Sequence, residues 1–170
     1  MLEKIQKINI LQRIWIFIIG KETPNTLTQA SVAIGFFVWL YLFSWHLITF
    51  VTLSLMGTLK NADKIEMAFA RVGRQYAGYI FGDVTSYLVV HSVAQFIVYG
   101  VSLTGLILIW RKKKLGFLLY IFSNVATYLV TFFILGSKYM FNELSFYDFL
   151  ILLTVTLYFA AGYFLFYRGK

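Results

Sequence analysis

The chain of 170 residues contains no cysteine, which excludes disulfide bonds, thiolate metal sites, covalent c-type haem attachment and thiol redox chemistry. Charged residues make up only 13% of it, about half of the share typical of a soluble domain. The single proline, Pro24, lies outside every apolar run, so the helices expected there should lack proline kinks. With so little charge, most of the surface of the folded chain is expected to face lipid.

Hydrophobic residues account for 60% of the chain and aromatic residues for 20%. Four apolar runs are each long enough to cross the hydrocarbon core of a bilayer, which takes about 20 residues of helix. We therefore predict an all-α integral membrane protein, in which a single membrane domain (1–170) forms an up-down bundle of four transmembrane helices. The predicted spans are residues 30–57, 84–110, 115–135 and 146–166.

Two further segments are amphipathic rather than apolar throughout. In residues 1–21, apolar side chains recur at three- and four-residue steps and basic side chains lie mostly elsewhere on the helix. This pattern favours an interfacial helix lying on the inner leaflet, with packing against the rest of the protein or a partner as the alternative. Residues 58–82 are expected to form an amphipathic external connection, and Lys138 to Glu143 a short polar turn.

The basic residues predict which side of the membrane each connection occupies. Ten of them lie in the N-terminal segment, in the cluster Arg111-Lys112-Lys113-Lys114 and at the C-terminus, against five in the other connections. The positive-inside rule then places both termini and the cluster in the cytoplasm, with the protein in the cell membrane. Because these charges border apolar runs, we expect them to meet anionic lipid headgroups at the cytoplasmic face, and we expect no nucleic acid partner.

Polar residues inside the apolar runs mark where any chemistry would take place, because they are costly in hydrocarbon. On the second predicted span a polar residue recurs every four positions, so these residues share one helix face. Together with polar residues of the third span they form a predicted seam: Asp83, Tyr87, Gln95, Asn124 and Thr127. The seam has two interpretations: hydrogen bonds between helices, or a pocket lined by His46, His91, Gln95 and Asn124. At the start of its span, Asp83 also fits a helix N-cap.

No catalytic motif, phosphate-binding loop or metal-site spacing is present in the sequence. We therefore expect a non-enzymatic subunit or interaction protein of a membrane complex, working with other membrane subunits or with a second copy of itself. A first alternative is an electron-transfer subunit that binds haem or quinone, with His46 and His91 as the cofactor-binding residues. A second alternative is a small-molecule carrier that acts as a homodimer.

Overall fold

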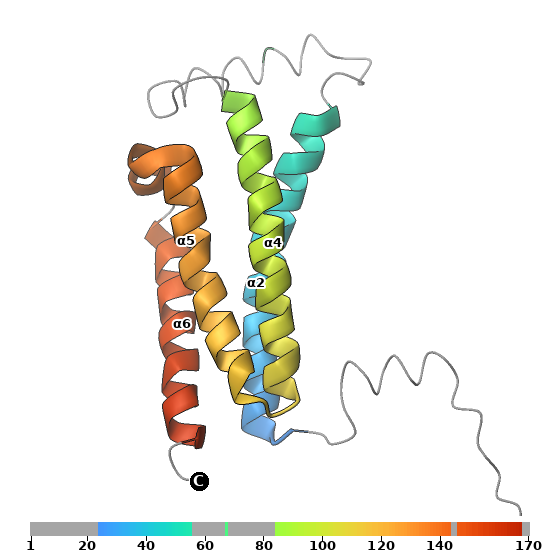
Figure 1. Cartoon of the computed structure of the whole chain (residues 1–170), viewed down its shortest axis with the longest axis vertical. Coiled ribbons are helices and arrows are strands. Elements are labelled where there is room, and N and C mark those ends of the chain that lie inside the picture. The colour runs from blue at the N-terminus through green and yellow to red at the C-terminus, as the bar shows by residue number, and fades with distance from the viewer. Residues whose placement is uncertain (1–23, 56–66, 68–83, 144–145, 168–170) are drawn as a thin grey trace, which may run out of the picture.

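The computed structural model describes residues 24–55, 67, 84–143 and 146–167. This part of the chain is helical and contains no strand. The predicted helix 1–21 lies outside the described residues, as does the connection 58–82 apart from Met67. The four long helices in Figure 1 are α2 (Thr26–Leu55), α4 (Val84–Trp110), α5 (Lys114–Glu143) and α6 (Phe146–Tyr167).

Two helix boundaries differ from the prediction for local reasons. Helix α2 begins four residues earlier than predicted because the Asn25 side chain caps it, accepting a hydrogen bond from the Thr28 backbone N–H at 2.9 Å. Helix α5 kinks at Gly136, where φ is 85°, and then continues to Glu143. The predicted end of the third span at residue 135 therefore agrees with the interruption of the helix at Gly136, whereas Lys138 to Glu143, predicted as a polar turn, form a further helical segment.

The turn between α4 and α5 is a Schellman motif. The backbone N–H of Lys113 donates to the Leu108 carbonyl at 2.8 Å, and that of Lys112 donates to the Ile109 carbonyl at 2.9 Å. Lys112 occupies the left-handed position with φ of 57°, where glycine is the usual residue. The motif satisfies the last carbonyls of α4 and lets α5 start at once, so the four basic residues gather in one tight turn.

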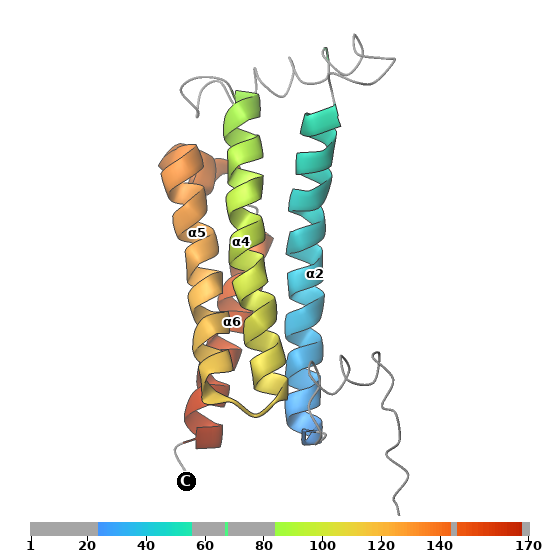
Figure 2. The same ribbon diagram turned by 45° about the vertical axis from the view of Figure 1, so that its right-hand side comes forward.

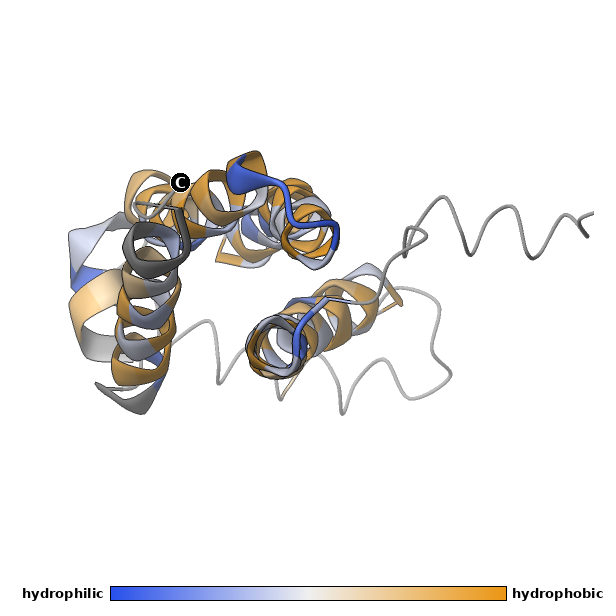
Figure 3. Ribbon diagram, turned by 90° about the horizontal axis from the view of Figure 1, so that it is seen from below, coloured by the Kyte–Doolittle hydropathy of each residue, from blue (hydrophilic) through white to orange (hydrophobic). Residues whose placement is uncertain are grey.

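The helices run alternately up and down and form a curved row in the order α2, α4, α5, α6 (Figures 1 and 2). Packing is most extensive between α4 and α5 and between α2 and α4, whereas α2 and α6 meet over a small area. The start of α2, the α4–α5 turn and the end of α6 lie at one end, which we call the turn end (Figure 1). Seen from that end, hydrophobic residues dominate the ribbons of all four helices (Figure 3).

The turn-end half is tightly packed by an apolar core. Leu106, Ile109, Phe117, Tyr120 and Phe159 are buried together there. Gly35, Gly105 and Gly116 permit the close approach of the helices. A Cβ on Gly116 would lie 2.5 Å from the Ile109 backbone nitrogen, and one on Gly105 would lie 2.9 Å from the Tyr120 nitrogen. A second, smaller core of Leu53, Leu88 and Leu135 holds the opposite end.

The described helices carry apolar side chains outward and polar side chains inward. Phe37, Ile97 and Phe133 are among the most exposed hydrophobic residues, at 69%, 70% and 78%. By contrast His91, Gln95 and several serines and threonines are buried. Helices α2, α4 and α5 are long and apolar enough to cross a membrane, and the apolar part of α6, Asp148–Tyr163, is shorter. This distribution fits a membrane protein, since lipid rather than water solvates such a surface.

Candidate functional site

The two histidines singled out in the sequence lie side by side. His46 comes from the middle of α2 and His91 from α4, and their rings meet edge to face with centroids 5.1 Å apart. The Tyr99 ring lies 5.5 Å from His46 and comes from α4, about two helical turns beyond His91. His91 and Tyr99 are only 5% and 3% exposed. The helices thus bring three polar rings together inside the protein.

His91 is held from α5 by a hydrogen-bond network centred on Gln95. The Gln95 side-chain nitrogen lies 3.0 Å from the Thr127 carbonyl, 3.2 Å from the Thr131 hydroxyl and 3.1 Å from His91 Nε2. The Thr131 hydroxyl in turn lies 3.0 Å from His91 Nε2. These contacts join α4 to α5 through side chains that are buried in the protein.

The network offers more acceptor positions than its protons can fill. The Gln95 amide nitrogen is a donor only and carries two protons, whereas it lies within hydrogen-bond distance of three atoms. The Thr131 hydroxyl donates to the Thr127 carbonyl at 2.9 Å. His91 Nε2 accepts from Gln95 in one arrangement of these protons and donates to Thr131 in another.

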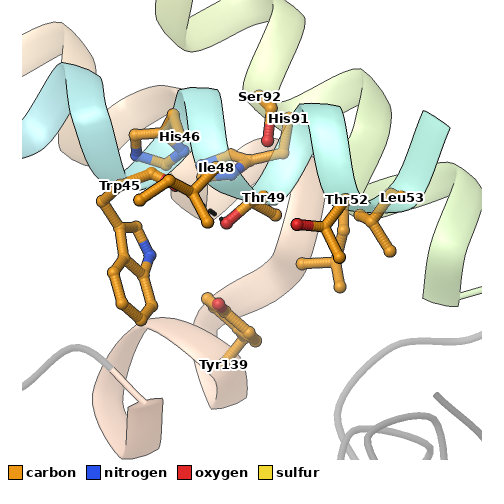
Figure 4. Close-up of a pocket in the computed structure, with 10 residues that line it drawn as sticks. Trp45, His46, Ile48, Thr49, Thr52, Leu53, His91, Ser92 and Tyr139 are labelled. Carbon is orange, nitrogen blue, oxygen red and sulfur yellow. Dashed lines mark hydrogen bonds between the residues drawn. The ribbon is translucent and has the colours of Figure 1, made fainter. Parts of the chain in front are cut away.

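A cavity of about 350 Å³ lies against the histidine pair. Its polar and aromatic walls come from α2, α4, α5 and α6, and they comprise Tyr41, Trp45, His46, His91, Tyr99, Thr127, Thr131, Tyr139 and Asp148, with Leu42 as the aliphatic member. A second hollow of about 240 Å³ adjoins it and shares Trp45, His46, His91 and Tyr139. Figure 4 shows Trp45 and Tyr139 facing one another across this second hollow, with the two histidines above them.

Asp148 joins the site although the sequence indicated only that it lies near the start of the last predicted span. It occupies the first turn of α6, where the helix dipole favours a carboxylate. Its Oδ1 accepts a hydrogen bond from the Tyr41 hydroxyl at 3.1 Å. Tyr41 is at the midpoint of the 30 residues of α2, so this contact lies at the level of the middle of α2, about 22 Å along the helix from either end. Tyr41, Trp45 and Tyr139 were likewise not among the predicted site residues.

Several polar groups around the cavity have no hydrogen-bond partner within the described residues. They are the Tyr99 hydroxyl, the Ser92 hydroxyl and the Gln95 side-chain oxygen. Thr127 lies near the Tyr99 hydroxyl without completing a hydrogen bond of good geometry. Buried groups of this kind are uncommon and are expected to be satisfied by a bound molecule or water. Of the three, Tyr99 lines the cavity of about 350 Å³, Ser92 lines the second hollow, and Gln95 lines neither, so the hydroxyls of Tyr99 and Ser92 belong to residues that a bound molecule would contact.

The other residues of the predicted seam do not join this cavity. Tyr87 is 41% exposed, and Asp83 lies outside the described residues. Asn124 is buried at a different contact, where its side-chain nitrogen donates to the Thr156 hydroxyl of α6 at 3.1 Å. The structure thus gathers His46, His91, Gln95 and Thr127 at one place and Asn124 at another.

The arrangement of the histidines does not suit haem. A haem held by two histidines lies between them, with a nitrogen of each directed at the iron from opposite sides. Here the rings touch edge to face, and His91 Nε2 is directed at Thr131 and Gln95. Among the described residues, no group of three or more His, Cys, Asp or Glu side chains is placed to hold a metal ion.

Comparison of the chain with protein-family models, with curated proteins and with solved structures finds no match. The function is therefore argued from the cavity and its surroundings alone.

Proposed function

We propose that the chain is a multi-pass protein of the cell membrane with four transmembrane helices, α2, α4, α5 and α6. Both termini and the Arg111–Lys114 turn face the cytoplasm, and residues 1–21 lie on the inner leaflet. The outward apolar side chains of the described helices support this proposal.

Within the membrane, we propose that the protein is a non-enzymatic subunit that acts by binding a small molecule between its helices. The observation that carries this proposal is the cavity of about 350 Å³ beside His46 and His91. This volume is in the range of small-molecule sites. Its walls combine aromatic rings with a few hydrogen-bonding groups, as such sites do. Purely structural polar contacts would leave no hollow and no unpartnered hydroxyl at Tyr99.

A carrier is the second alternative, and it requires a site that is closed on one side at a time. The hollows beside the histidines do not show such closure, because a third hollow of about 260 Å³ lies at the turn end against Ile109, Phe117 and Phe159. The electron-transfer alternative is supported less well, because the histidine pair is turned away from a shared iron position. A quinone could still bind in the cavity, because its carbonyl oxygens need only hydrogen-bond donors, and mass spectrometry of the purified protein would detect it.

The experiment compares two tryptophan substitutions on α2. Leu42→Trp adds an indole to a cavity wall, whereas Leu40→Trp makes the same change at a side chain that is 42% exposed and outside the cavity lining. Each protein is purified from its own membranes in a maltoside detergent, and bound small molecules are identified by mass spectrometry. We expect a species retained by the wild-type protein and by Leu40→Trp to be lost from Leu42→Trp. Equal retention by all three, or no retained species in any, would contradict the proposal.

A further inference from the structure

The cavity has one charged group in its described walls, and that group is negative. Asp148 lines it, and no Lys or Arg is among the described residues that do so. This is notable in a chain of net charge +8, which has more than twice as many basic as acidic residues. We infer that the ligand of this site is an organic cation, a substituted ammonium group held between Asp148 and the aromatic walls. This inference rests on the proposed function, since it names the chemical class of the ligand of that same cavity.

The aromatic walls are the first reason for this class. Tyr41, Trp45, Tyr99 and Tyr139 contribute to the lining from α2, α4 and α5. The face of an aromatic ring carries negative potential and attracts a cation within about 6 Å of its centroid, and several such rings around a carboxylate are the usual recognition site for quaternary ammonium groups. An anionic ligand would meet the same rings and the carboxylate unfavourably.

The size and depth of the site are the second reason. A metal cation such as Ca²⁺ takes about six to eight oxygen ligands, and a single carboxylate with scattered hydroxyls does not supply them. An alkylated ammonium group spreads its charge over carbon atoms and loses less hydration on entering an apolar region. The volume of about 350 Å³ is also far larger than one ion needs. The midpoint position of Tyr41 on α2 keeps the site away from both helix ends.

The hydrogen-bonding groups are the third reason. The Tyr41 hydroxyl donates to Asp148 Oδ1, which orients the carboxylate and leaves its other oxygen as an acceptor. The Tyr99 hydroxyl is buried and unpartnered within the described residues, so its lone pairs are available to an ammonium N–H or to a hydroxyl beside the ammonium group.

Two sources could supply such a ligand: the ammonium headgroup of a membrane lipid, or a free amine. The test uses choline and its uncharged carbon isostere, 3,3-dimethylbutan-1-ol, which differ in charge and hardly at all in shape. Binding to the full chain is measured by titration calorimetry in maltoside micelles. The titration is repeated in lipid nanodiscs of phosphatidylglycerol, with and without phosphatidylethanolamine. Competition by phosphatidylethanolamine would identify a lipid headgroup as the source, and unchanged choline affinity would identify a free amine.

We expect choline to bind at least about tenfold more tightly than the isostere, and Asp148→Asn to remove that preference. Asp148→Glu should restore part of it, and Trp45→Leu should weaken choline about threefold to tenfold. Glu22→Gln, the same chemical change before the start of α2, is the control and should leave binding unchanged. Thermal unfolding in micelles verifies that each variant is folded. If a variant fails to fold, the comparison of choline with its isostere on the wild-type protein still tests whether the site prefers a cation.

The negative outcomes separate the two proposals. Equal binding of choline and its isostere, abolished by Leu42→Trp, would show that the cavity binds ligands but that their charge is irrelevant, which overturns the cation inference alone. Preferential binding of acetate over choline would also overturn it. If neither choline nor its isostere binds and no species co-purifies with the wild-type protein, the proposed binding function fails together with the inference.

Discussion

Replacing Gly116 by alanine tests the close packing of α4 against α5. A Cβ on Gly116 would lie 2.5 Å from the Ile109 nitrogen, 2.6 Å from the Gly105 oxygen and 2.8 Å from the Leu108 carbonyl carbon. Non-bonded carbon contacts are optimal at about 3.5–4.0 Å, so the turn would have to move by roughly 1 Å. All three contacts are with backbone atoms, which cannot rotate away.

The magnitude follows from comparison with a second glycine. Gly100→Ala is the matched control, because a Cβ there meets no atom within 4 Å. Both substitutions replace a helical glycine and so gain a similar helix propensity, about 0.5–1 kcal/mol. The difference between them therefore isolates the clash. Inserting one methyl group into packed surroundings costs about 1–3 kcal/mol, and we expect Gly116→Ala to be less stable than Gly100→Ala by that amount.

The assay is reversible unfolding in mixed micelles as the fraction of sodium dodecyl sulfate rises, followed by far-ultraviolet circular dichroism. We expect Gly100→Ala to unfold at or above the wild-type midpoint and Gly116→Ala clearly below it. If the two variants unfold at the same midpoint, the reasoning is refuted, because the α4–α5 hairpin would then have space at Gly116 for a methyl group.

Two further predictions concern the same pair of helices. A double-mutant cycle of Gln95→Leu and Thr131→Val should give a coupling free energy of about 0.6 kcal/mol and at most about 1.7 kcal/mol. If the effects of the two single substitutions are strictly additive, a direct hydrogen bond between these side chains is ruled out. Lys112→Gly should raise the free energy of unfolding by about 1 kcal/mol, because glycine adopts the left-handed conformation of the Schellman turn without steric cost. An unchanged unfolding midpoint in the same micelle assay would contradict the left-handed conformation of residue 112.

The helices could be predicted from sequence because each one is a continuous apolar run. The end of α4 at Trp110 agrees with the predicted span, since a cluster of charges follows directly. Helix boundaries that depend on a single side chain were harder to predict from the sequence. Asn25 extends α2 by a capping hydrogen bond, and the residues after the interruption at Gly136 form a further helical segment where the sequence pattern predicts a polar turn.

The candidate site was predictable only in part. Residues at four-residue steps on α4 share one face, so the proximity of His91, Gln95 and Tyr99 follows from helix geometry. The contact with His46 depends on the packing of α2 against α4, which no periodicity specifies. The place of Asp148 in the site was missed for a similar reason: its contact with Tyr41 sets the start of α6 at the level of the middle of α2, and only the tertiary arrangement shows this.

The most direct test of the proposed topology exploits the absence of cysteine in the chain. Single cysteines are introduced at Lys113, in the α4–α5 turn, and at Lys60, between α2 and α4, and intact cells are treated with a membrane-impermeant maleimide. We predict that Lys60→Cys is labelled in intact cells and that Lys113→Cys is labelled only after the membrane is permeabilised. The reverse pattern would contradict the assigned orientation, and labelling of both positions from the same side would show that α4 does not cross the membrane.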